Sequence, residues 1–158
     1  MQRLLSRLIL AVALIGMLIG FYLLVFYVTI PLKELPPQLA LEMYKPHGHR
    51  VEQQIITSDD PVYRRLKSFL DSERTGWQWN VITIAPGPYA LRAEGLTIRC
   101  YTNLMVIDVY DPPGHHPRSY RKDVPNLLQT LGLPESSEWK DWYEKLRTDS
   151  KRSPHRSR

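Results

Sequence analysis

The chain has 158 residues, a formal net charge of +5 and a single cysteine, Cys100. One cysteine excludes an internal disulfide, so a folded domain must depend on packing alone. The positive charge lies at the two ends, because residues 31–144 carry 13 Lys and Arg against 15 Asp and Glu, whereas residues 145–158 carry six against one. A slightly acidic middle has no basic field for a phosphate backbone, which argues against nucleic-acid binding.

Residues 8–30 contain no charged side chain and are mostly apolar. A helix of this length measures about 35 Å, enough to cross a hydrocarbon core of about 30 Å. We therefore expect a transmembrane helix, and an uncleaved signal anchor rather than a signal peptide, because no small-residue cleavage site comes after it. Gly16 and Gly20 form a G-x-x-x-G spacing, which predicts a possible homodimer through this helix.

The short segment before the apolar run, residues 1–7, carries Arg3 and Arg7. Positive charge before a first span favours a cytoplasmic N-terminus. The sequence therefore predicts a single-pass protein of the inner (plasma) membrane, in contact with the lipid bilayer, with its C-terminal domain outside the cytoplasm, as in a periplasm.

Residues 31–50 are expected to form a linker, because Pro31, Pro36 and Pro37 end the apolar helix and stiffen the residues after it. Residues 51–147 then read as a small domain. A strand over 51–57 is followed by a helix that begins near Ser58–Pro61, where capping side chains precede a proline. Strands are expected near 77–84, 89–94, 96–101 and 104–110, with a tight turn at Glu94-Gly95.

Two amphipathic helices close the domain, one carrying Val124 to Leu131 and one carrying Trp139, Trp142 and Tyr143. Residues 148–158 are charged and lack apolar residues, which predicts a basic disordered tail. The expected fold class is α+β: an N-terminal transmembrane helix, then an antiparallel sheet of four or five strands packed with about three helices.

The loop histidines are the one arrangement that suggests a metal site. His115 and His116 follow Asp111, and imidazole with carboxylate is a common zinc ligand set. The H-E-x-x-H spacing is absent, however, and so are nucleophile-elbow and phosphate-loop motifs. A metal-dependent hydrolase is thus the alternative, and the main expectation is a non-enzymatic protein without a cofactor.

Aromatic residues are the remaining signal. One helical layer cannot bury both faces of a sheet, so some aromatic rings are expected to be exposed, as at protein interfaces. The candidate binding residues are Trp77, Trp79, Tyr101, Trp139 and Trp142. The sequence therefore predicts an anchored domain that binds another protein, as an accessory subunit of an envelope complex or an immunity-type inhibitor. A structural membrane subunit acting through its span is a further alternative.

Overall fold

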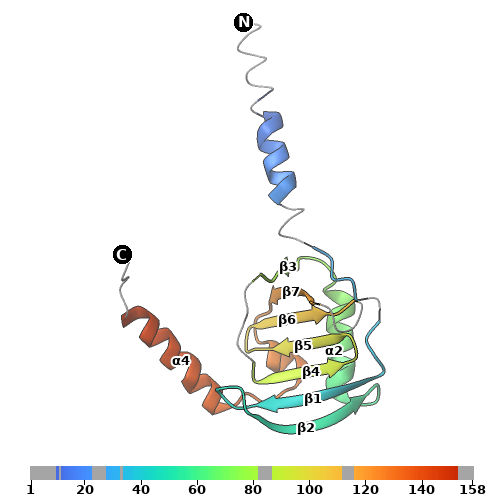
Figure 1. Ribbon diagram of the computed structural model, residues 1–158, viewed down its shortest axis with the longest axis vertical. Coiled ribbons are helices and arrows are strands. Elements are labelled where there is room, and N and C mark those ends of the chain that lie inside the picture. Colours follow the sequence, from blue (N-terminus) through green and yellow to red (C-terminus); the bar gives the residue numbers. More distant parts are fainter. Residues whose placement is uncertain are drawn as a thin grey trace, which may run out of the picture.

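A computed structural model describes residues 10, 12–22, 28–32, 34–81, 87–111 and 116–152. Residues 12–22 are helical and precede a mixed α and β domain (Figure 1). The labelled elements are β1 (Gln38–Tyr44), β2 (Arg50–Thr57), α2 (Pro61–Ser72), β3 (Gln78–Trp79), β4 (Tyr89–Ala93), β5 (Leu96–Cys100), β6 (Leu104–Val109), β7 (Arg118–Asp123), α3 (Leu127–Leu131) and α4 (Ser137–Arg152).

The domain is built on one antiparallel sheet of seven strands in the order β2-β1-β4-β5-β6-β7-β3. The expected hairpin at Glu94-Gly95 is confirmed, since Ala93 pairs with Leu96 and Gly95 has a φ of 72°. The expectation of four or five strands was wrong, because β1 and β7 were missed. Strand β1 lies within the segment expected to be a linker, and β7 contains one apolar residue, Tyr120.

The two faces of the sheet differ in what covers them. Helices α2 and α3 lie behind the sheet in Figure 1, whereas no described helix covers the face toward the viewer. Side chains alternate between the faces along each strand. The core combines α2 and α3 with the alternate strand residues Leu39, Leu41, Leu91, Ile98, Cys100, Met105 and Ile107. We call the uncovered side the open face.

The predicted start of α2 is confirmed. Asp60 is its N-cap, and its side chain accepts a hydrogen bond of 2.7 Å from the Val62 backbone N–H. This cap gives a hydrogen-bond partner to one of the first backbone N–H groups, which have no acceptor within the helix. The buried face of α2 presents Tyr63, Leu66 and Leu70 to the sheet.

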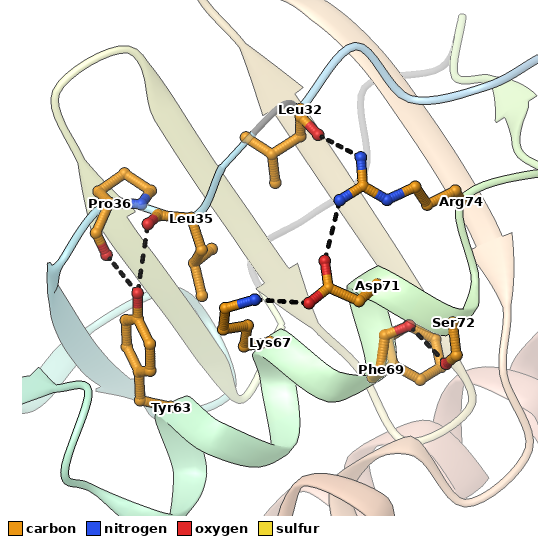
Figure 2. A network of polar contacts seen from close by, with 9 residues as sticks. All are labelled: Leu32, Leu35, Pro36, Tyr63, Lys67, Phe69, Asp71, Ser72 and Arg74. Atoms are coloured by element: carbon orange, nitrogen blue, oxygen red, sulfur yellow. Dashed lines mark hydrogen bonds and ion pairs between the residues drawn. The ribbon is translucent and has the colours of Figure 1, made fainter.

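Polar contacts fix the segment before β1 against α2 (Figure 2). The Tyr63 hydroxyl donates to the carbonyls of Leu35 and Pro36, at 3.2 and 2.9 Å. Arg74 donates to the Leu32 carbonyl at 3.5 Å and pairs with Asp71 at 2.9 Å. These bonds, with Ile30 buried in the core, make residues 30–32 and 34–36 part of the folded domain.

The expected transmembrane helix over residues 8–30 is not supported. Among the described residues, none of the helices combines the length and the apolarity needed to cross a bilayer. The last part of the run belongs to the domain instead. Val28 exchanges backbone hydrogen bonds of 2.7 and 3.2 Å with Trp77, and the Ile30 side chain is buried in the core. These apolar side chains pack on protein. The rest of the run, residues 8, 9, 11 and 23–27, lies outside the described residues.

The signal-anchor and single-pass interpretations depend on this helix and are not supported either. The alternative of a structural subunit acting through its N-terminal segment is not tested and stays a prediction. Gly16 and Gly20 lie in the helical segment 12–22, where a Cβ added to either glycine would meet no atom within 4 Å. The contact predicted between two copies at these glycines is not tested by one chain and stays a prediction.

The C-terminal helices form close to where they are expected. Helix α3 contributes three buried leucines, Leu127, Leu128 and Leu131. Helix α4 begins at Ser137 and extends to Arg152, five residues into the range expected to be disordered. Figure 1 shows it projecting from one end of the sheet. Residues 153–158 lie outside the described part.

Candidate protein-binding surface

The five aromatic candidates do not form one patch. Trp77 is fully buried, and its indole N–H donates to the Glu73 carbonyl at 2.6 Å. Trp79 lies on β3, is 42% exposed and packs on Tyr120 with ring centroids 4.8 Å apart. Trp77 is therefore a core residue, and Trp79 presents a ring to solvent at the β3 edge.

Trp139 and Trp142 do come together, at the start of α4. Trp139 is buried and donates its indole N–H to the Tyr44 carbonyl at 2.6 Å, which ties α4 to the end of β1. The Trp142 ring stands edge-on to Trp139 at 5.3 Å and to His47 at 6.4 Å. This cluster joins α4 to the β1–β2 hairpin, so its main role is structural.

Tyr101, the fifth candidate, is buried next to this cluster. Burial raises the pKa of its hydroxyl above 10.0, and the Arg99 charge partly opposes the shift. Burial also raises the pKa of the Tyr143 hydroxyl, with a smaller contribution from Tyr101. Both rings are core-like, and neither offers a contact surface.

The open face carries charged and polar side chains, none of which is among the five aromatic candidates. Cross-strand pairing aligns one residue from each of the seven strands in a row. From β2 to β3 that row reads Gln53, Glu42, Ala90, Arg99, Val106, Arg121 and Gln78. A second row contains Ile55, Ala40, Arg92, Thr97, Asp108 and Ser119. Most of these positions hold charged, polar or small residues, whereas the other face holds apolar side chains. Ala90, Val106 and Asp108 in the middle of the rows are buried, so the solvent-exposed part of this face is formed mainly by Arg92 and by residues of β2.

Glu42 is the centre of the polar network on this face. It is only 5% exposed, yet it accepts hydrogen bonds from Tyr44 at 2.5 Å, Arg50 at 2.9 Å and Arg92 at 2.7 Å. Burial alone would raise the pKa of this carboxyl. The three donors, together with the charge of Arg92, outweigh burial and hold the pKa below its usual 4.5. Glu42 is therefore ionised at neutral pH and positions two guanidinium groups.

A second buried carboxylate repeats this arrangement on β6. Asp108 is 5% exposed and accepts a hydrogen bond from Arg99 at 2.7 Å. Arg121 follows on β7 and contacts the Gln78 side-chain oxygen at 3.3 Å. Buried charges are tolerated when they are paired and hydrogen-bonded, and here the pairing fixes a row of arginines across the open face.

A hollow lies between α2 and residues 30, 32, 34 and 35, beside the network of Figure 2. It has a volume of about 330 Å³ and an apolar floor of Ile30, Leu32, Leu35 and Leu70. Its charged rim pairs internally, because Lys67 contacts Asp71 at 2.6 Å and Asp71 contacts Arg74. The rim therefore serves to hold the chain before β1.

The described residues show no arrangement of side chains that supports the alternative of a metal site. Asp111 and His116 are both exposed, and His115 lies outside the described residues. Within the described ranges, no three side chains of His, Cys, Asp or Glu are placed to share an ion. Cys100 is also a poor nucleophile, because complete burial raises its pKa to about 12.

Comparisons with known proteins do not extend these observations. No protein-family model matches the chain, and neither a curated protein nor a solved structure matches it. The surface chemistry of this chain is therefore the remaining indication of its function.

Proposed function

We propose that this chain is a non-enzymatic domain that binds another protein through the open face of its sheet. The observation that carries the proposal is the Glu42 centre, where one buried carboxylate positions Arg50 and Arg92. Their side chains remain 53% and 47% exposed, so both guanidinium groups are fixed and still reach solvent.

The chemistry of these groups indicates the kind of partner. One carboxylate shared by two arginines leaves one positive charge in excess at this corner of the sheet. A guanidinium group held in a fixed orientation suits a carboxylate, to which it can donate two parallel hydrogen bonds. Arginine and tyrosine are also enriched at the residues that dominate interface energies. We therefore infer that the partner presents Asp or Glu side chains to Arg50 and Arg92.

The size of the open face suits a protein better than a small molecule. Six spacings of about 4.8 Å between seven strands make the sheet roughly 29 Å wide. A standard interface buries about 800 Å² on each partner, and the exposed arginines Arg50 and Arg92 lie toward the β2 edge of this sheet. Small-molecule sites are instead concave and enclosing. The hollows around α2 and α3, and a further hollow lined by Tyr44 and Trp139, have none of Glu42, Arg50 and Arg92 in their lining.

Capture of a partner by the tagged full-length chain in mild detergent tests the proposal. The double variant Arg50→Ala, Arg92→Ala is compared with Arg64→Ala, which removes an exposed arginine from α2 on the other side of the sheet. We expect the wild type and Arg64→Ala to retain the same protein and the double variant to lose it, with capture weakening as salt is added. Equal capture by all three chains would overturn the proposal.

The predicted place of action, outside the cytoplasm at a bacterial-type inner membrane, stays a prediction, and so do the roles of envelope subunit or immunity-type inhibitor. A reporter that is active only outside the cytoplasm, fused after Arg158, tests the location. Activity supports an envelope role, whereas activity of a matching cytoplasmic reporter alone would contradict it.

A further inference from the structure

The two edges of the sheet are unequal. One edge is β3, which has two residues, whereas the other is β2, which has eight. Strand β2 pairs with β1 alone within the described chain, and Figure 1 shows no element on its outer side. Six consecutive residues, 50–55, are exposed, including Ile55 at 61%. A long edge strand with an exposed apolar residue is a template for another strand.

The direction of the backbone groups on this edge follows from one hydrogen bond. The Tyr44 N–H donates to the Pro88 carbonyl at 2.9 Å, so Tyr44 directs its backbone groups toward β4. Backbone direction alternates along a strand, so Met43 and Leu41 face β2 and bond there with their partners Glu52 and Gln54. The backbone groups that point outward from β2 are then those of Gln53, Ile55 and Thr57.

This outward row is symmetric about Ile55. It is bounded by the register shift opposite Met43 and Tyr44 at one end and by the turn after Thr57 at the other. The Thr57 carbonyl also accepts from the Asp60 N–H at 2.9 Å, which leaves its N–H and a second lone pair for a neighbour. A partner strand that matches this row must present three outward residues of its own with the same spacing.

A second β2 strand meets that requirement. We propose that two copies of this chain pair antiparallel through β2, with a two-fold axis at Ile55, to give one continuous sheet. In this register Ile55 lies opposite Ile55 of the second copy, and Gln53 lies opposite its Thr57. Every outward group of the row then has a partner, and the paired stretch from Gln53 to Thr57 contains no charged residue.

The charges beyond this stretch complement each other. Antiparallel pairing brings the start of one β2 beside the end of the other. Arg50, whose side chain is about half exposed, then approaches Asp59 and Asp60 at the end of β2 in the second copy, and the contact occurs twice by symmetry. A register centred on Gln53 would instead place Ile55 opposite the irregular residue Val51, where the outward row is interrupted. The Ile55 register is therefore the one that uses the whole edge.

An axis perpendicular to the sheet leaves both open faces on the same side. The dimer therefore presents two open faces and leaves Arg92, which lies on β4 two strands in from the edge, accessible to a partner. Arg50 lies beside the edge contact, so the dimer and the proposed function share this one residue and are distinguished through Ile55 and Arg92.

Oligomeric state and cross-linking of the full chain test the edge contact. Wild type, Ile55→Lys and Ile55→Pro are compared by sedimentation in mild detergent, with circular dichroism to confirm folding. In Ile55→Lys, two lysines lie opposite each other across the two-fold axis and repel. In Ile55→Pro, the strand loses an outward N–H that the second copy would bind, whereas its bonds to β1 remain. We expect a wild-type dimer and about tenfold or greater weakening in Ile55→Lys, which tests the contact even where Ile55→Pro fails to fold.

Cross-linking tests the register. Paired residues on neighbouring strands have Cα atoms about 5.5 Å apart, within the range of a disulfide. Ile55→Cys should therefore form a disulfide-linked dimer under mild oxidation, whereas Ser68→Cys, exposed on α2, should not, and the buried Cys100 should not contribute. A monomeric wild type, an Ile55→Lys dimer as tight as the wild type, or equal cross-linking at Ser68 would overturn the proposal. Capture of the partner by wild type and by Arg92→Ala is a separate readout, because Arg92 lies two strands in from this edge and takes no part in the dimer contact.

Discussion

Neighbouring residues on the central strands belong to opposite surfaces of the sheet. Leu91, Ile98 and Ile107 are fully buried beneath the helices. The next residue along each strand faces the other way, and these residues are Arg92, Arg99 and Asp108. The helix-covered face is held by apolar burial, whereas the open face is held by ion pairs around two buried carboxylates. Apolar burial on the covered face therefore stabilises the fold, whereas the ion pairs on the open face determine which charged groups reach the surface.

The difference follows from the covering elements. Apolar side chains gain about 25 cal/mol per Å² when they leave water, and α2 and α3 supply that cover on one side only. On the open face, an apolar row would form a large exposed patch. Pairing with Glu42 instead orders Arg50 and Arg92 and leaves both side chains about half exposed to water, as the proposed contact with a partner requires.

The largest expected effect lies on the covered face. Ile98→Ala removes a fully buried side chain and leaves a cavity among Leu91, Ile107 and the helices. Such truncations cost about 2–5 kcal/mol of unfolding free energy. Urea denaturation measures the loss, and Val81→Ala, at a side chain that is 89% exposed, is the control. A similar loss at both positions would contradict the division between the faces.

The next effect is expected at Glu42. Glu42→Ala leaves Tyr44, Arg50 and Arg92 without their common acceptor, which should cost about 1–3 kcal/mol. Glu42→Gln keeps the shape and one acceptor, so its cost should be smaller. Urea midpoints of both variants measure the order, and a more stable Glu42→Ala would contradict the role of this network.

Acid should weaken the open face through the same residue. The pKa of Glu42 is lowered in the folded protein, so its ionised form stabilises the fold above the ordinary value of 4.5, and this contribution is lost as the pH falls through the lowered pKa. Unfolding of the wild type and Glu42→Gln is compared at about pH 7 and about pH 3. The difference between the two proteins should shrink in acid, and a constant difference would show that ionisation of Glu42 is not involved.

A smaller effect is expected where α4 meets the sheet. Trp139→Phe keeps an aromatic ring but removes the hydrogen bond to the Tyr44 carbonyl, which should cost about 1 kcal/mol. Trp142→Phe, at a half-buried position, serves as the matched control. Thermal unfolding measures both, and equal stability of Trp139→Phe and the wild type would argue that α4 is not tied to β1 by this bond.

The smallest effect on stability belongs to the residues proposed to bind. Arg92→Ala removes a half-exposed partner of Glu42, and Arg50 and Tyr44 remain to hold the carboxylate. Pairs of this exposure contribute about 0–1 kcal/mol. Capture of the partner should nevertheless fall. A variant that unfolds and loses capture together would show that Arg92 is structural.

Much of the covered face was predictable from the sequence. The alternation in 89–94 and 96–101 correctly indicates Leu91 and Ile98 as core residues, and the Asp60 cap marks the start of α2. Strand β1 also has alternating apolar residues, Leu39, Leu41 and Met43, but the prolines just before it favoured a linker. Strand β7 has one apolar residue, Tyr120, and is held in the sheet by pairing with β6 and β3. An alternation of apolar and polar residues, the pattern that predicts a strand, is therefore absent from its sequence.

The transmembrane helix was the main error. Composition alone does not say what covers an apolar side chain, and Val28 and Ile30 pack within the domain through contacts with residues more than 40 positions away. The open-face site was missed for a related reason. Arg92 and Arg99 were visible as polar positions on two strands, but Glu42, which organises Arg92, lies on the strand that was not predicted.

Arginine labelling of the complex tests the central claim most directly. Phenylglyoxal modifies exposed guanidinium groups, and mass spectrometry locates each modified residue. We expect binding of the captured partner to protect Arg50 and Arg92 on the open face and to leave Arg64 on α2 as reactive as in the free chain. Protection of Arg64 with unchanged labelling of Arg50 and Arg92 would place the partner on the helices and contradict the account.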